Sequence, residues 1–115
     1  MHFEQAFGTI NADETRRRVF IEQIQRFWER HQITPDEILS VYRQGRHTVL
    51  CCQSGAEIYC TDPMHQVLEA LPAENFLSIS RSAIVRRDKI VHISSSGVYT
   101  MADGKTFQGR TRYLS

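Results

Sequence analysis

The apolar residues near the start of the chain recur at the spacing of one face of a helix. Asp13 is a good N-cap for a helix that begins at residue 14, and Pro35 makes the residue before it prefer an extended backbone. The pattern therefore predicts an amphipathic helix over about residues 14–31. Its apolar stripe consists of Phe20, Ile24, Phe27 and Trp28.

After Pro35 the pattern changes to short runs of β-branched, aromatic and cysteine residues, which residues typical of turns separate. Ser54-Gly55 predicts a two-residue hairpin loop, which would set Cys51 opposite Ile58. Asp103-Gly104 predicts another hairpin nearer the end of the chain. We expect strands at residues 38–42, 48–52, 57–60, 76–85, 90–93, 98–101 and 106–109.

A second, short helix is predicted between the third and fourth of these strands. Asp62 is a suitable N-cap, Pro63 fits the first helical position, and Leu71-Pro72 closes the helix. The fold class is therefore mostly β, with about seven short strands and two helices. We expect an N-terminal segment, residues 1–34, that holds the amphipathic helix, followed by a β domain over residues 35–115.

The composition limits the class of protein. A chain of 115 residues has the size of one domain, and 41% hydrophobic and 23% charged residues are typical of a globular protein. No apolar run is long enough to span a bilayer, and the first residues lack the pattern of an export signal. Three cysteines without Cys-x-x-Cys spacing argue against a disulfide framework. We expect a cytoplasmic chain with reduced thiols and no membrane partner.

The net charge of +1 conceals an uneven distribution of charge. Residues 1–79 carry seven Lys or Arg and eleven Asp or Glu, whereas residues 80–115 carry seven basic and two acidic residues. A basic C-terminal third is typical of a surface that faces a polyanion. An uneven but merely solvated surface explains the charges equally well.

The sequence contains no pattern that indicates catalysis. Gly104-Lys105-Thr106 resembles the end of a phosphate-binding loop, but Tyr99 stands where that motif requires its first glycine. The five histidines include no i, i+4 pair with a glutamate between them, as a zinc-binding helix has. We expect no enzyme activity, no cofactor and no metal site.

Three polar segments are rich in hydrogen-bond donors. They are residues 43–48, the turn Ser80-Arg81-Ser82 and the tail at residues 109–113. An arginine beside hydroxyl groups suits a phosphate oxygen or the edge of a guanine, which arginine can bind with two hydrogen bonds. Each segment alone is more often a solvated loop, but the three together are typical of a nucleic-acid-binding face.

Several stretches follow one another in the order of a known DNA-binding domain. They are EILSV at residues 37–41, GRH at 45–47, SG at 54–55, MHQVLEALP at 64–72, FLSISRSAIV at 76–85, DG at 103–104 and RTRYL at 110–114. The stretch at 76–85 is the most specific, since it is similar to F-x-R-I-H-R-S-Y-I-V. From about Asp36 to its end, the chain resembles the LytTR DNA-binding domain of bacterial response regulators.

The resemblance implies an elongated arrangement of small antiparallel sheets, whose loops enter successive major grooves of bent DNA. It implies a transcriptional regulator that binds double-stranded DNA sequence-specifically, as a homodimer on a repeated site. Arg81 and Arg112 are the candidates for contacts with base edges. The full set of DNA-binding candidates is Arg46, His47, Ser80, Arg81, Ser82, Lys89, Arg110, Thr111 and Arg112.

The sequence departs from the family pattern at three positions and at its N-terminus. Ser78, Ser80 and Ala83 replace an arginine, a histidine and an aromatic residue, which changes the recognised sequence more than the fold. Members of the family usually carry a receiver domain, whereas here we expect a stand-alone domain that follows an aromatic helix.

The sequence leaves the role of that N-terminal helix open. Its stripe of Phe20, Ile24, Phe27 and Trp28 could form a homodimer interface or bind a regulatory protein. In the second case the chain would be a protein-interaction module of LytTR ancestry. The stripe is equally well explained if the helix covers one face of its own domain.

Overall fold

The computed structural model describes the backbone of residues 2–110 and the side chains of residues 14–110. The fold is elongated, with principal extents of 56 × 35 × 26 Å. It contains the helices α1 (His2–Arg30) and α2 (Met64–Ala70), and single 3-10 turns at Pro35–Glu37 and Arg87–Lys89. The strands are β1 (Ile38–Gln44), β2 (His47–Cys52), β3 (Glu57–Cys60), β4 (Phe76–Ser80), β5 (Ala83–Arg86), β6 (Ile90–Ile93), β7 (Val98–Met101) and β8 (Thr106–Gln108).

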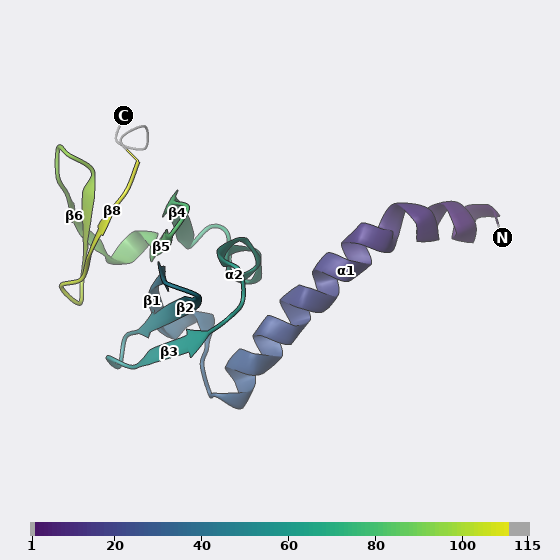
Figure 1. The fold of residues 1–115 in the computed structure, drawn as a ribbon, viewed down its shortest axis with the longest axis horizontal. Coiled ribbons are helices and arrows are strands. Elements are labelled where there is room, and N and C mark those ends of the chain that lie inside the picture. The colour runs from purple at the N-terminus through teal and green to yellow at the C-terminus, as the bar shows by residue number, and fades with distance from the viewer. Residues whose placement is uncertain (1, 111–115) are drawn as a thin grey trace.

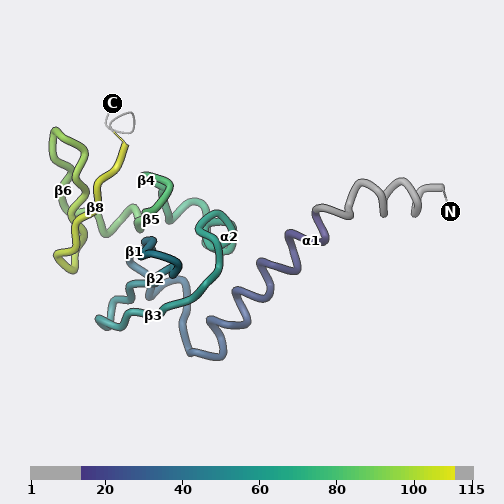
Figure 2. Tube along the Cα trace, in the orientation of Figure 1, coloured from purple at the N-terminus to yellow at the C-terminus, as the bar shows by residue number. Residues whose placement is uncertain are grey.

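The strands form two small antiparallel sheets. The larger sheet has the order β3-β2-β1-β5-β4, and the smaller has the order β6-β7-β8. The smaller sheet lies beside the β4–β5 hairpin, and α2 lies between that hairpin and the long helix α1 (Figure 1). The trace in Figure 2 shows the same arrangement, with the chain passing from α1 directly into the larger sheet. The structure thus confirms a mostly β fold with one short and one N-terminal helix.

The expectation of a single strand over residues 76–85 is wrong, because the chain reverses at Arg81-Ser82. The hydroxyl Oγ of Ser80 accepts the backbone N–H of Ser82 at 3.2 Å, which is the local bond that serine offers in turns. Two paired strands, β4 and β5, result. The described residues therefore contain eight strands and not about seven.

The β2–β3 hairpin has a register one residue away from the predicted one. Cys51 lies opposite Glu57, not opposite Ile58. The loop has three residues, since the N–H of Cys52 donates to the carbonyl of Ala56 at 2.9 Å, and Gly55 takes the left-handed φ of +93°. Such a three-residue loop is a common hairpin type, and a shift of one residue moves each side chain to the other face.

Helix α1 begins at His2, well before the predicted start at residue 14. Asp13 therefore lies inside the helix and does not cap it. Once a helix is formed, each added residue gains a backbone hydrogen bond, whereas an N-cap is worth only about 1 kcal/mol. A good capping residue consequently does not have to mark the start of a helix.

The apolar stripe of α1 is divided between the core and the surface. Ile24 and Trp28 are each only 2% exposed and belong to a core with residues of β1, β2 and α2. Phe27 is half-buried against that core, and Phe20 is 40% exposed. The helix thus covers part of its own domain, and Ile24 and Trp28 are not accessible to a second copy or a partner protein.

A second core joins the two sheets. It consists of Ile79, Ala83 and Val85 from the larger sheet, and of Tyr99 and Met101 from the smaller sheet. Gly109 lies against this core, where an added Cβ would stand 2.5 Å from Cε1 of Tyr99. The absence of a side chain at Gly109 lets the end of β8 approach the larger sheet closely.

Candidate nucleic-acid interface

Two of the donor-rich segments lie at the same end of the larger sheet. The strand β1 ends at Gln44, where the chain turns back into β2, and its neighbour β5 begins at Ala83 opposite Tyr42. The backbone N–H of Arg43 donates to the carbonyl of Ser82 at 3.0 Å. Since β1 and β5 are antiparallel, the β1–β2 turn and the β4–β5 turn must be neighbours at this end, which we call the turn end of the sheet.

The β1–β2 turn holds Arg46 at its tip. The turn is tight because Gly45 has a φ of +61°, in the region that favours glycine. The side chains of Arg46 and His47 are both exposed. The ring of His47 meets the ring of Tyr59 edge to face, with 5.9 Å between their centroids, so the imidazole has a defined position.

The β4–β5 turn presents Arg81 between two serines. The hydroxyls of Ser80 and Ser82 are 3.4 Å apart, and the hydroxyl of Ser78 donates to the carbonyl of Ser80 at 3.2 Å. These bonds order the turn itself. Arg81 is exposed and has no ion-pair partner among the described residues. Its guanidinium donors are available to an external acceptor.

The third segment starts beside the second. The backbone N–H of Arg110 donates to the carbonyl of Ile79 at 2.9 Å, so Arg110 lies next to the strand that leads into the Ser80–Ser82 turn. Its side chain is half-buried. The predicted contacts Thr111 and Arg112 lie outside the described residues.

Several basic residues of the C-terminal third are not at the turn end. Lys89 follows β5 at the opposite end of the sheet, and is half-buried there. Arg86 is buried over the ring of Phe76, and its Nε donates to the carbonyl of Ile38 at 2.8 Å. Lys105 forms an ion pair of 3.5 Å with Glu57. The basic charge of this third is therefore partly structural.

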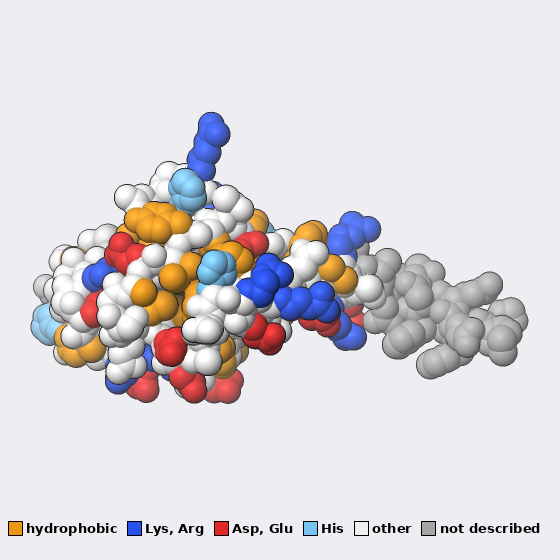
Figure 3. Space-filling model, turned by 90° about the horizontal axis from the view of Figure 1, so that it is seen from below, with side chains coloured by type: hydrophobic (Ala, Val, Ile, Leu, Met, Phe, Trp, Pro, Cys, Tyr) orange, Lys and Arg blue, Asp and Glu red, His pale blue; other side chains and the backbone are white. Residues whose placement is uncertain are grey.

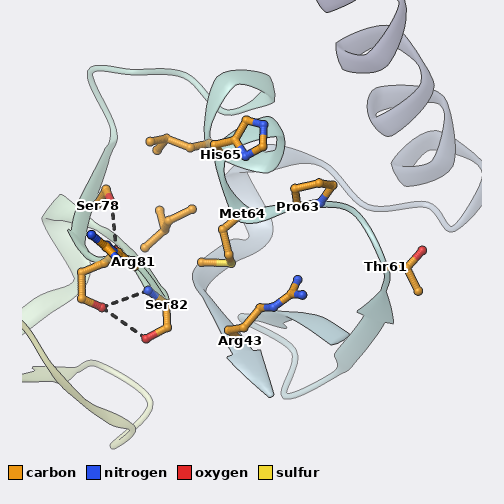
Figure 4. Close-up of a pocket in the computed structure, with 11 residues that line it drawn as sticks. Arg43, Thr61, Pro63, Met64, His65, Ser78, Arg81 and Ser82 are labelled. Carbon is orange, nitrogen blue, oxygen red and sulfur yellow. Dashed lines mark hydrogen bonds between the residues drawn. The ribbon is translucent and has the colours of Figure 1, made fainter. Parts of the chain in front are cut away.

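A groove adjoins the two turns. It has a volume of about 580 Å³ and lies between the β4–β5 turn, α2 and the connection from β3 to α2. Arg43 and His65 line it together with Arg81, and Figure 4 shows the three side chains around its opening. The guanidinium of Arg43 also donates to Oγ1 of Thr48 at 3.0 Å. Two guanidinium groups therefore line the groove, and the one of Arg43 is engaged with Thr48.

Arg43 and His65 are absent from the set of residues predicted from the sequence. Arg43 falls in a segment whose donor content is visible in the sequence, but its place beside Ser82 depends on the pairing of β1 with β5. His65 belongs to the short helix α2, and nothing near it in the sequence indicates a binding role. Both residues reach the groove through tertiary pairing.

The described side chains offer little chemistry beyond hydrogen bonding and charge. Among residues 14–110, no three His, Cys, Asp or Glu side chains are grouped closely enough to hold a metal ion. Burial raises the pKa of the thiols of Cys51, Cys52 and Cys60, which disfavours reactive thiolates. No helix in the described part of the chain is long and apolar enough to cross a membrane.

Comparisons with known proteins point to one family. The model of the LytTr DNA-binding domain matches residues 29–114. A solved structure with a TM-score of 0.64 is described as the LytTr DNA-binding domain of a methyl-accepting/DNA response regulator from Bacillus cereus. The two chains are 15% identical, and the match covers 71% of this chain and 78% of that one. No curated protein matches the sequence.

Proposed function

This chain belongs to the LytTR family of DNA-binding domains, and from that membership we propose that it regulates transcription by binding double-stranded DNA sequence-specifically through the turn end of its larger sheet. The observation that supports the proposal is the common position of two donor-rich turns and of Arg110, the described start of the third segment. The β1–β2 turn and the β4–β5 turn are linked by the bond from Arg43 to Ser82, and Arg110 is bonded beside β4.

The proposed roles follow from exposure and geometry. Arg81 stands at the tip of an ordered turn with its guanidinium unpaired among the described residues, as contact with a base edge in the major groove requires. Arg46, His47 and the two serines of the β4–β5 turn supply donors for phosphates. We retain Thr111 and Arg112 as proposed contacts, because they follow Arg110 directly. Lys89, at the other end of the sheet, is not part of the proposed surface.

We also propose that two copies of the chain bind together to a repeated DNA site. One turn end presents only a few donors, and DNA-binding modules commonly gain affinity by occupying two half-sites about one helical turn apart. The proposed activity is cytoplasmic, because that is where a bacterial promoter is bound. Sedimentation of the chain with and without DNA measures whether two copies occupy one duplex.

A titration of two duplexes tests the proposed function. The first duplex is the tightest binder selected from a random library, and the second has the same bases in shuffled order. Fluorescence anisotropy at about 50 and about 200 mM salt gives the affinity and its salt dependence. We expect the selected duplex to bind at least about 10³-fold more tightly than the shuffled one. If the selected and the shuffled duplex bind with equal affinity at both salt concentrations, sequence-specific recognition is contradicted.

A second candidate function rests on the exposed apolar part of α1. Val19 is 44% and Phe20 is 40% exposed, which suits the binding of a regulatory protein. A partner-regulating module would depend on these residues and not on Arg81. DNA titration of R81A and of the double variant V19S/F20S separates the candidates. Loss of selective DNA binding in R81A alone favours the DNA-binding function of the turn end, whereas an unaltered chain that does not distinguish the two duplexes favours the partner-regulating function.

A further inference from the structure

We propose that one face of α1, defined by Arg16 and Arg30, extends the DNA-binding surface beyond the turn end and binds phosphates of the DNA that flanks the recognised site. This inference rests on the proposed function, and assigns a DNA contact to a helix that lies almost wholly before the matched residues 29–114.

The groove at the turn end continues onto α1 in two directions. His65 lines the groove and also lines a hollow between α2 and α1, where Arg16 and Phe20 form the opposite wall. Thr61 likewise lines the groove and a second hollow, which Arg30 and Gln23 border from α1. The groove that Arg81 lines therefore adjoins both hollows that border α1.

Helical geometry places Arg16 and Arg30 on this same side. At about 100° per residue they are only about 40° apart around the axis, and at 1.5 Å per residue they are about 21 Å apart along it. Arg18 is about 160° away from Arg16 around the axis. It lines a different hollow, on the other side of Arg17 with Glu14 and Ile21.

The described arginines of α1 differ in whether they form ion pairs. Arg17 is engaged with Glu69 at 3.2 Å, and Arg26 approaches Glu22 at 4.0 Å. Arg16 and Arg30 are exposed and have no ion-pair partner among the described residues. Figure 3 shows arginine side chains (blue) on α1 where the helix leaves the domain.

The acidic residues near this face are few. Glu69 borders the first hollow, where Arg17 neutralises it, and Asp62 borders the second. Aromatic side chains fill the space between the two arginines, with Phe20 and Phe27 on α1 and Tyr59 on β3. Guanidinium groups on a semi-rigid helix, rather than on a loop, suit a backbone contact that carries no sequence information.

The test uses two double variants of the full chain that remove the same charge from the same helix. R16Q/R30Q changes the proposed face, and R17Q/R18Q is the control, because Arg17 is already engaged with Glu69 and Arg18 lies about 160° around the helix axis from Arg16. Each is titrated against the selected duplex, either limited to the bound site or extended by about one helical turn, roughly 10 base pairs, on each side. Thermal unfolding verifies that both variants fold like the unaltered chain.

We expect R16Q/R30Q to lower the slope of log affinity against log salt by about 2 on the extended duplex, with an affinity loss of about tenfold. The control should change the slope by less than about 1, and neither variant should differ from the unaltered chain on the short duplex. Base preference should stay the same throughout, because phosphates carry no sequence information.

Three outcomes overturn the proposal. Equal slopes for the two variants on the extended duplex mean that net charge alone matters. If R16Q/R30Q loses as much affinity for the short duplex as for the extended one, flanking DNA is not involved. A change from dimer to monomer mass with an unchanged slope means that the face binds a second copy. If the unaltered chain does not distinguish selected from shuffled DNA, the proposed function itself is wrong, which is a different result.

Discussion

The backbone N–H of Arg110 donates a hydrogen bond to the carbonyl of Ile79 across 2.9 Å, between residues 31 positions apart in the chain. This bond holds the end of the described chain against β4, two residues before Arg81. Two segments that are distant in the sequence thereby become neighbours at the turn end. The DNA-binding surface is thus a product of tertiary structure, and no single stretch of sequence contains it.

Replacement of Arg81 by alanine is expected to weaken binding to the selected duplex by about 1–3 kcal/mol, and to relax the preference at one base pair. The physical reason is the loss of a bidentate donor at the tip of an ordered turn. Anisotropy against single-base variants of the duplex measures both effects. Arg87→Ala, which removes an exposed arginine at the opposite end of the sheet, is the control. Unchanged affinity and base preference in R81A would remove Arg81 from the interface.

Replacement of Gly109 by alanine is expected to destabilise the chain by about 1–3 kcal/mol. The new Cβ would lie 2.5 Å from Cε1 of the buried Tyr99 and 3.2 Å from Cβ of Ile79, so the ring or the strand end must move. Denaturant unfolding measures the loss of stability, and DNA titration shows whether the segment around Arg110 is displaced. Ser95→Ala, at an exposed loop position, should leave both unchanged.

Replacement of Trp28 by alanine is expected to cost about 3–5 kcal/mol, because this side chain is only 2% exposed in the core of its own domain. A domain of ordinary stability would lose a large part of its free energy of unfolding. Phe20→Ala, which changes a side chain that is 40% exposed, should cost much less. Similar small losses in the two variants would show that α1 is not part of the core.

Replacement of Arg86 by alanine is expected to reduce stability, by about 2–4 kcal/mol, and not to act through DNA contacts. The guanidinium lies 4.6 Å from the ring centroid of Phe76 and donates to the carbonyls of Ile38 and Pro35. In the alanine variant both carbonyls would lose this hydrogen-bond donor. Chemical denaturation measures the effect. The same change at the exposed neighbour Arg87 should be close to neutral.

The three thiols are expected to react slowly in the folded chain at neutral pH. Burial raises the pKa of Cys51, Cys52 and Cys60, so each holds its proton more firmly in the folded than in the unfolded state. Folding therefore favours proton binding, and this contribution to stability is lost as pH rises above the ordinary thiol pKa of 9.0. Labelling with a thiol reagent, with and without denaturant, measures the protection. Fast labelling of the native chain at pH 7 contradicts it.

Local sequence patterns predicted an element well where turn residues and hydrophobic periodicity alone determine its bounds. The bounds of β3, β6 and β7 agree with the structure, as does the short helix after Pro63. Residues 76–85 were predicted as one strand, although the stretch contains the polar turn Ser80-Arg81-Ser82, because the run around that turn is rich in strand-forming residues. The hydrogen bond to the hydroxyl of Ser80 fixes the turn and divides the run into two strands. The local sequence around Gly55 fits a three-residue loop as well as a two-residue loop, so it does not determine the register of the hairpin.

Long-range packing decided what the sequence left open. The stripe of α1 has the same pattern whether it covers its own domain or another chain, and only the core around Ile24 and Trp28 distinguishes the two. Basic residues also look alike in sequence. Arg86 is buried and Lys105 is paired with Glu57, whereas Arg81 is exposed. Charge counted along the chain therefore overestimates the basic surface available to DNA.

The most direct test of the turn end as the DNA-binding surface is a map of backbone amide chemical shifts on addition of the selected duplex. Recognition through this end predicts that the largest shifts fall on the two turns, at Arg46 and at Arg81 with its neighbouring serines, and on Arg110. Amides around Gly55 and Lys89, at the opposite end of the sheet, should change little. Shifts concentrated at that opposite end, with the turns unaffected, would contradict the proposed mode of DNA binding.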